Sequence, residues 1–149
     1  MCALRFSTDL KNYIVNKAVV EKLAGTCGTA GTATIKIYTG AQPANADAAT
    51  AGTLLCSIAG KIGWGTSVGV AAGTAALAEG AGYNGTATVS GTAGWARIEC
   101  VGLGYSGSAA TFRVDGDVGT SVSSTFVINS VTITSGGVVS LLTAPVLMA

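Results

Sequence analysis

Charged residues are scarce in this sequence. Asp, Glu, Lys and Arg make up 10% of its 149 residues, whereas an ordinary soluble domain carries roughly 25%. A surface with so little charge is poorly suited to keeping single copies apart in solution. We therefore expect a subunit that covers much of its surface with copies of itself or with other proteins. The net charge is +1 and the 8 basic residues are scattered, so nucleic-acid binding is not expected.

Histidine is absent altogether, which removes the base of a Ser–His or Cys–His nucleophile pair. The four cysteines, Cys2, Cys27, Cys56 and Cys100, lie far apart without CxxC spacing. They are predicted to be free, mostly buried thiols rather than zinc ligands. The glycines follow neither GxGxxG nor GxxxxGK[ST], the patterns of nucleotide-binding loops. The sequence thus predicts no catalytic residues, no cofactor and no metal, and a protein that is not an enzyme.

Long apolar runs are also missing. No stretch of about 18 apolar residues is present, so a membrane-spanning helix is not expected. The N-terminal residues, MCALRFSTDLKNY, lack the apolar core of a signal peptide. We expect the protein to be made and kept in a cytoplasm unless it leaves within a larger particle.

Residues 7–24 are the one segment with helical periodicity. Leu10, Ile14 and Ala18 recur at intervals of four, which places them on one face of an amphipathic helix. Gly25 follows at a position where helices commonly end in glycine. We expect the apolar face to dock on the chain's own sheet or on a neighbouring subunit.

Alternating apolar residues begin at residue 34. Ile35 and Ile37 share one face of a predicted strand, and Leu54, Cys56 and Ile58 repeat the pattern. The long loop between these strands is expected to project from the sheet and to touch a neighbouring subunit. Its candidate interface residues are Gln42, Pro43 and Asp47.

The second half of the chain has the pattern of short strands. Trp95, Arg97 and Glu99 alternate with Ala96 and Ile98, so the two sets face opposite sides of one strand. Frequent turn signals between such runs are typical of antiparallel all-β folds. We predict a single domain over residues 1–149 that is mainly β. It would be an antiparallel β-sandwich or barrel over residues 34–147, with one N-terminal amphipathic α-helix.

Four short segments carry turn signals. Asn84-Gly85 and Gly136-Gly137 are dipeptides typical of tight turns. A change of phase between the runs 126–128 and 131–133 predicts a bulge or turn near Asn129-Ser130. Asp115-Gly116-Asp117 is interpreted as a turn whose carboxylates bond the backbone. A calcium ion held by Asp115 and Asp117 is the alternative, although a full loop of oxygen ligands is missing.

The large aromatic residues allow two interpretations. Trp64 and Trp95 are predicted to anchor the core or an interface, because the chain has few other residues of this size. A carbohydrate-binding module that uses Trp64, Trp95 and Tyr83 is the alternative. That module would present these rings in an exposed groove, whereas an assembly protein would bury them.

Several blocks of the sequence resemble a family of small virion structural proteins of tailed bacteriophages. The segment KIYTGAQPANADAATAGTLLCSI resembles that family's I-Y-[ST]-G-x-Q-P-x-x-A-D-A-A-x-x-G-T-L-L block. GTAGWARI, FRVDGDVG and FVINSVTITSGGVVSL resemble its later blocks in the same order, and STDLKNYIVNK resembles its N-terminal segment. The chain departs from the family pattern at Ala96 and over residues 60–81.

The resemblance implies a non-enzymatic structural protein located in the virion. Such proteins include head-decorating and neck or tail components, and we expect a capsid decoration (cement) protein that stabilises the head. Its partners would be itself, as a homotrimer or other homo-oligomer, and the major capsid protein or other virion proteins. A neck, tail or fibre-base protein is the alternative. Together with the loop residues, Leu10, Ile14, Ala18, Trp64 and Trp95 are the candidate interface positions.

Overall fold

The computed structural model describes residues 34–59, 74–76, 83–101, 111–143 and 145–147. The predicted helix over residues 7–24 and its face of Leu10, Ile14 and Ala18 lie outside these residues. Within them the fold is mainly β, with strands β1 (Thr34–Thr39), β2 (Leu54–Ala59), β3 (Thr74–Ala76), β4 (Asn84–Thr86), β5 (Gly91–Val101), β6 (Thr111–Gly119), β7 (Phe126–Ile128), β8 (Thr132–Ile133), β9 (Val138–Thr143) and β10 (Pro145–Leu147). The described residues form no helix long and apolar enough to cross a bilayer.

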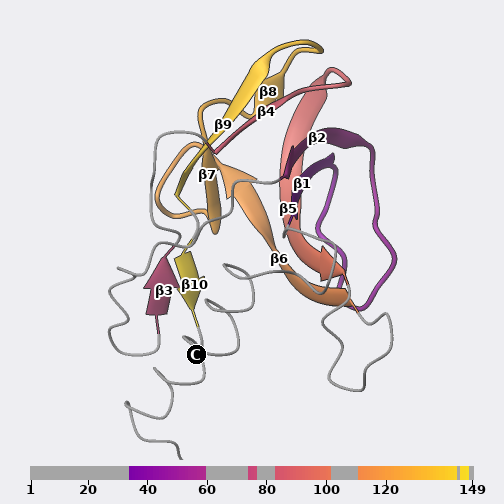
Figure 1. Cartoon of the computed structure of the whole chain (residues 1–149), viewed down its shortest axis with the longest axis vertical. Coiled ribbons are helices and arrows are strands. Elements are labelled where there is room, and N and C mark those ends of the chain that lie inside the picture. Colours follow the sequence, from indigo (N-terminus) through magenta and orange to yellow (C-terminus); the bar gives the residue numbers. More distant parts are fainter. Residues whose placement is uncertain (1–33, 60–73, 77–82, 102–110, 144, 148–149) are drawn as a thin grey trace, which may run out of the picture.

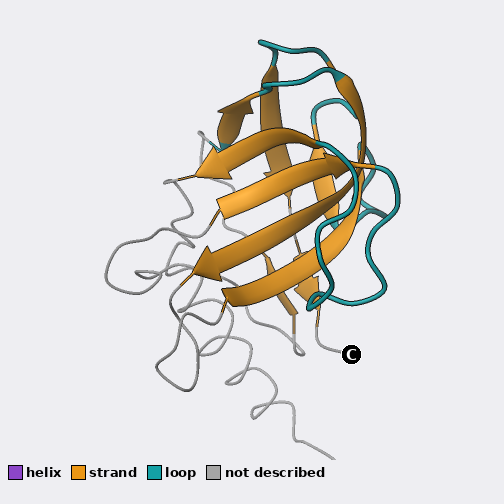
Figure 2. Ribbon diagram, turned by 90° about the vertical axis from the view of Figure 1, so that its right-hand side faces the viewer, coloured by secondary structure: helices purple, strands orange, loops and turns teal. Residues whose placement is uncertain are grey.

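The main sheet curls into a nearly closed barrel. Its strands follow the order β2-β1-β5-β6-β7-β9-β4, and β8 pairs with the first residues of β5. Figure 2 shows the broad strands curving across one side, with the remaining strands behind and above them. β10 does not belong to this sheet. It pairs with β3 in a separate two-stranded sheet (Figure 1).

The inner face of β1 and β5 forms one half of the core. Ile35 and Ile37 of β1 stand opposite Ile98 and Ala96 of β5, and all four side chains are fully buried. The predicted alternation on both strands is therefore confirmed. Fully burying one isoleucine contributes about 1.5–3 kcal/mol, so this row contributes strongly to the stability of the barrel.

The pattern predicted for β2 is correct at two of its three positions. Cys56 and Ile58 are buried as expected, but Leu54 lies partly exposed and Leu55 is buried in its place. The cause is a shift of register between Ile37 and Tyr38, which pairs Tyr38 with Leu54. An irregularity of this kind changes which face the following residues occupy. Periodicity alone does not reveal it.

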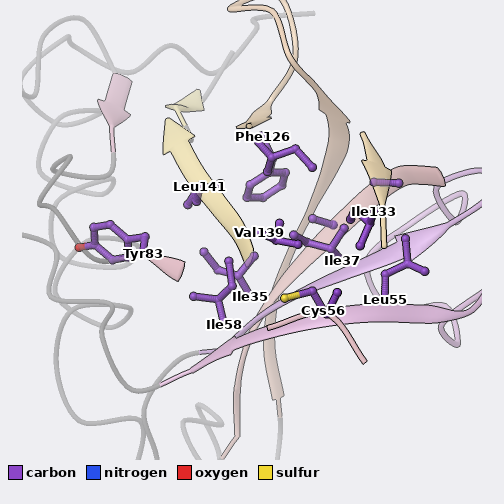
Figure 3. Packing of buried hydrophobic residues seen from close by; sticks show 14 of the residues in the cluster. Ile35, Ile37, Leu55, Cys56, Ile58, Tyr83, Phe126, Ile133, Val139 and Leu141 are labelled. Atoms are coloured by element: carbon purple, nitrogen blue, oxygen red, sulfur yellow. The ribbon is translucent and has the colours of Figure 1, made fainter. Parts of the chain in front are cut away.

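The other half of the core comes from β7, β8 and β9. Phe126, Ile128, Ile133, Val139 and Leu141 are buried in one cluster with the isoleucines of β1 and β2. Figure 3 shows Phe126, Ile133, Val139 and Leu141 gathered around Ile35, Ile37 and Ile58. β7 and β8 are separate strands, which confirms the predicted break near Asn129-Ser130. The chain also turns before Gly137, whose N–H bonds the oxygen of Thr134, with Gly136 at φ 81°. The Gly136-Gly137 prediction is thus confirmed as well.

One neighbouring pair of strands is parallel, although the sequence predicted an antiparallel fold. β6 and β7 pair through Val118 with Phe126 and Gly119 with Val127. The chain between them folds back on itself, because the N–H and the hydroxyl of Thr125 both donate to Asp117 Oδ1, at 3.0 and 2.6 Å. β7 therefore starts beside the end of β6 and runs in the same direction.

The barrel is closed by a short contact between β2 and the chain at β4. Cys56 forms a β-bridge with Ala87, and the N–H of Thr88 donates to the oxygen of Leu55 at 2.9 Å. The predicted turn at Asn84-Gly85 is wrong, because both residues belong to β4 and pair with β9. Gly85 has a packing role instead. A Cβ at this position would lie 2.6 Å from Cys56 Sγ and 2.9 Å from the oxygen of Ser57.

Gly85→Ala is expected to lower the free energy of unfolding by about 1–3 kcal/mol, the usual cost of overpacking a core. The added methyl group would push β4 away from β2. Chemical denaturation of the purified variant measures the loss. In a Cys56→Ala background the loss should be smaller, because one of the crowding atoms is gone. An unchanged unfolding curve for Gly85→Ala would contradict this account of the closure.

Candidate functional site: the outer face of β1, β5 and β6

The outer face of the central strands carries large polar and aromatic side chains. Tyr38 of β1 stands opposite Trp95 of β5, and Arg97 of β5 stands opposite Asp115 of β6. We refer to these four residues as the Arg97 cluster. Because side chains alternate along a strand, they share the face opposite to Ile98 and Val114. β5 is consequently buried on both faces between Trp95 and Ile98.

Arg97 and Asp115 form a buried, bidentate ion pair. Arg97 Nε donates to Asp115 Oδ1 and Nη2 donates to Oδ2, both at 2.7 Å. The side chains are 1% and 3% exposed. The hydrogen bond that Arg97 donates to Asp115 raises the pKa of Arg97 above its ordinary value, so the guanidinium stays charged inside the protein. Two parallel charge-assisted hydrogen bonds also fix its orientation.

Trp95 lies between Tyr38 and Arg97. The rings of Tyr38 and Trp95 are stacked, with centroids 4.6 Å apart and planes inclined by 14°. The guanidinium carbon of Arg97 lies 5.3 Å from the centroid of the Trp95 ring, within the range of a cation–π interaction. Burial raises the pKa of the Tyr38 hydroxyl. The three side chains form a continuous stack across β1 and β5.

The loop of residues 40–53 covers this stack. Trp95 Nε1 donates to the backbone oxygen of Ala51 and Arg97 Nη1 donates to that of Ala48, both at 3.2 Å. The loop is the purple segment that joins β1 to β2 in Figure 1. The sequence predicted that it projects from the sheet. The part of the loop at Ala48 and Ala51 instead packs on the sheet through these bonds, and its contact with a neighbouring subunit stays a prediction. Two buried donors on the sheet need acceptors, and the loop backbone supplies them.

The ends of the loop are fixed by backbone geometry. Gly40 and Gly52 have φ angles of 80° and 82°. Residues other than glycine adopt such angles only at a cost in conformational energy. The N–H of Thr39 donates to the oxygen of Thr53, and the N–H of Thr53 donates to Thr39 Oγ1. A short turn at Asn45, whose Oδ1 accepts from the N–H of Asp47, orders the middle of the loop.

The predicted interface residues fall into three groups. Gln42 and Asp47 are exposed on the loop and Pro43 is half-buried. Trp95 has no exposed surface and supports the loop from below. Trp64, like the predicted helix face, lies outside the described residues. The structure thus brings the loop and Trp95 into one site, with Trp95 in the interior.

The turn predicted at Asp115-Gly116-Asp117 is wrong, because these residues lie inside β6. Gly116 is needed there for packing, since a Cβ would lie 2.5 Å from Thr125 Cγ2. Both oxygens of Asp115 accept from Arg97, and Asp117 accepts from Thr125. The two carboxylates therefore do not join in one calcium site. In the described part of the chain no three His, Cys, Asp or Glu side chains form a group that could hold a metal ion.

Asp117 gives the described residues an acid-dependent contact. Its hydrogen bonds from Thr125 lower its pKa below the ordinary 3.8. The resulting stabilisation is fully present at pH values above the pKa that Asp117 has in the unfolded chain. It is lost as the pH falls through the pKa of Asp117 in the folded protein. We expect the melting temperature of the wild type to fall as the pH is lowered from about 5 to about 2.5. The melting temperature of Asp117→Asn should fall less over the same range. Thermal unfolding followed by circular dichroism tests this, and equal acid dependence in both proteins would contradict it.

Arg97 is a site residue that the sequence did not single out, and Asp115 was interpreted as a turn residue or a calcium ligand rather than as the partner of Arg97. The charge of Arg97 was a weak signal. In the sequence Trp95-Ala96-Arg97-Ile98, alternation places this charge on the same side of the strand as a large aromatic residue. What covers that face depends on the loop, more than 40 residues away in the sequence. The remaining close ion pair on this face, Lys36 with Glu99, is partly exposed.

Two of the three rings proposed for sugar binding are buried. Trp95 is fully covered and Tyr83 is 8% exposed, so neither presents a face to a carbohydrate. Stacking on a sugar requires an accessible ring face, and the carbohydrate-binding interpretation is therefore wrong for these two residues. Trp64 lies outside the part of the chain that the structure describes.

Comparison with known proteins adds no relative. No protein-family model, no curated protein and no solved structure matches this chain.

Proposed function

We propose that the chain is a non-enzymatic structural subunit of a bacteriophage virion, and within the virion a capsid decoration protein. The observation that carries the proposal is the meeting of three separate sequence blocks in one place. Three of the blocks that resemble the phage family contribute to the site: the loop comes from KIYTGAQPANADAATAG, Trp95 and Arg97 from GTAGWARI, and Asp115 from FRVDGDVG. They contact one another through hydrogen bonds and a ring stack.

The meeting of these blocks gives them a common structural role. The buried pair and the stacked rings contact the loop and one another. They hold a loop in one conformation on the surface of a barrel. A subunit that is used in many copies benefits from such a fixed loop, because rigid surfaces lose little conformational entropy on assembly.

The outer surface is also suited to protein contacts. Charges on the central strands are largely paired within the chain, as in Arg97–Asp115 and Lys36–Glu99. Exposed aliphatic side chains occur at Val122, Val138 and Leu142, with Val122 88% exposed. Burial of such groups between subunits is favourable, and many small contacts add up by multivalency. The proposed partners are further copies of the chain, as a homotrimer or other oligomer, and the major capsid protein.

Deleting the gene from the phage that encodes the chain tests the proposal. Binding only to the assembled shell stabilises that shell by mass action. Particles that lack the protein should therefore form but release DNA at lower temperature or under osmotic shock. Adding back the purified protein should restore them. Sedimentation of the isolated protein should show a species larger than 14.5 kDa.

Two outcomes would overturn the decoration role. If deletion leaves head stability unchanged and blocks tail attachment or adsorption, the protein is a neck, tail or fibre-base component. If the protein is absent from purified particles, the virion proposal itself fails. Quantitative mass spectrometry of the particles decides this, since a head decoration protein is present in many more copies than a neck or tip protein.

A further inference from the structure

The dipeptide Asn84-Gly85 is chemically reactive as well as closely packed. In a flexible chain, the backbone nitrogen of the residue after an asparagine attacks the carbonyl carbon of the asparagine side chain. A following glycine favours this attack, because it has no Cβ to hinder the approach and its backbone turns easily. The reaction closes a succinimide ring and makes asparagine one of the thermolabile residues of proteins. The sequence thus contains one dipeptide that would deamidate readily if it were unfolded.

The side chain of Asn84 is accessible to this reaction. Asn84 is exposed on β4. The carboxamides of Asn45 and Asn129 accept hydrogen bonds from backbone N–H groups, whereas no described residue bonds the carboxamide of Asn84. Any protection must therefore come from the backbone of Gly85, which supplies the attacking nitrogen.

The backbone of Gly85 is held by β9, which lies beside β4 (Figure 1). The N–H groups of Leu141 and Ala87 donate across this pair of strands on either side of Gly85, at 2.9 Å each. Hydrogen-bonded pairs recur at every second residue of an antiparallel ladder. Gly85 and Val139, which stand opposite one another, form the pair between them. The N–H of Gly85 is therefore directed at β9 and away from the side chain of Asn84.

We propose that Asn84 is a deamidation site whose reaction is controlled by the pairing of β4 with β9. While the strands are paired, the nitrogen of Gly85 is not available for attack. When β4 separates from β9, this nitrogen loses its proton and bonds to Cγ of Asn84, and the side-chain amide leaves as ammonia. Water then opens the succinimide at either carbonyl, which gives aspartate or isoaspartate at position 84.

Isoaspartate at this position does not fit back into the barrel. It adds one methylene group to the backbone, which displaces the following residues of β4 along β9. Gly85 has no room for such a shift, because even a Cβ would lie 2.6 Å from Cys56 Sγ and 2.9 Å from the oxygen of Ser57. Ala87, which forms the closing bridge with Cys56, follows directly after β4. Formation of isoaspartate therefore keeps the barrel open at this edge.

Mass spectrometry of a peptide that contains position 84 tests the inference on the full chain, incubated at mildly alkaline pH. The conversion of amide to carboxyl raises the mass of this peptide. We expect it to proceed at least about tenfold faster in guanidinium chloride than in the folded wild type. Val139→Ala weakens the strand opposite Gly85 and should react faster than the folded wild type. Val114→Ala, the same truncation in the central strand β6, is the matched control and should react at the wild-type rate.

The effect on closure is tested with Asn84→Asp. This variant carries the charge of the deamidated protein on a backbone of normal length, so it should melt close to the wild type. The deamidated fraction that contains isoaspartate, separated by ion exchange, should melt at a lower temperature than Asn84→Asp.

Three results would overturn the inference. No gain of mass in the unfolded chain would show that Asn84 is not a deamidation site. Equal rates in the folded and unfolded protein, or in Val139→Ala and Val114→Ala, would show that pairing with β9 does not control the reaction. Equal melting temperatures of the isoaspartate form and Asn84→Asp would show that the longer backbone is accommodated.

Discussion

Asp115→Ala is expected to lower the free energy of unfolding by about 3–5 kcal/mol, the usual cost of removing one partner of a buried ion pair. The reason lies in Arg97, whose side chain is 1% exposed and would keep its charge without a counter-ion. Its Nε and Nη2 would also lose their acceptors. Denaturant unfolding of the purified variant gives the value directly.

A double variant provides the control for this prediction. Arg97→Met with Asp115→Leu removes both charges and keeps apolar volume, and such replacements are often neutral or stabilising. We therefore expect it to be more stable than Asp115→Ala. Because the bond from Arg97 to Ala48 is also lost, protease should cleave the 40–53 loop faster than in the wild type. A loss below about 1 kcal/mol for Asp115→Ala, the level of a surface pair, would show that the pair does not hold the site.

Trp95→Ala is expected to cost about 3–5 kcal/mol, the range for removing a large buried aromatic side chain. The substitution leaves a cavity below the 40–53 loop, removes the stack with Tyr38 and takes away the donor to Ala51. Trp95→Phe keeps most of the volume and loses the hydrogen bond, and should cost less than Trp95→Ala. Thermal unfolding and limited proteolysis of the loop measure the two effects.

An exposed residue serves as the comparison for Trp95. Val122→Ala changes a side chain that is 88% exposed, and surface substitutions of this kind usually stay within about 0.5 kcal/mol. If Trp95→Ala unfolds at the same denaturant concentration as Val122→Ala, the ring does not support the loop. A binding defect in Trp95→Ala would in any case act through the loop, because the ring has no exposed surface.

Sequence periodicity predicted the strands that have one apolar face. Ile35 and Ile37 of β1 and Ala96 and Ile98 of β5 lie where alternation places them. The face of a strand on which a side chain lies depends only on its position along that strand, so it can be predicted from a single sequence. The mainly β character of the described residues follows from the same pattern.

Turn signals were less reliable because packing can override them. Asn84-Gly85 lies in a strand, and Gly85 is required by the approach of Cys56 rather than by a turn. Asp115-Gly116-Asp117 likewise lies in β6, where Gly116 makes room for Thr125. Glycine permits both a turn and a close approach, and only the neighbours, which are distant in sequence, decide between them.

The candidate site was predicted only in part for a similar reason. Alternation showed that Trp95 and Arg97 share a face, but it cannot show what covers that face. The cover is a loop with no periodicity, held through its backbone oxygens. Backbone acceptors carry no sequence signal, so the buried role of Arg97 could be found only in three dimensions.

The short closure of the barrel has a consequence for its dynamics. β5 is bonded along both edges to β1 and β6, whereas β2 meets the chain at β4 through the bridge from Cys56 to Ala87 and the bond from Thr88 to Leu55. Amide protons are exchanged for deuterium wherever a structure opens locally, and weakly bonded edges open first. The amide of Thr88, which donates to Leu55, should therefore exchange long before that of Ile98. We expect the barrel to open into a curved sheet before it unfolds.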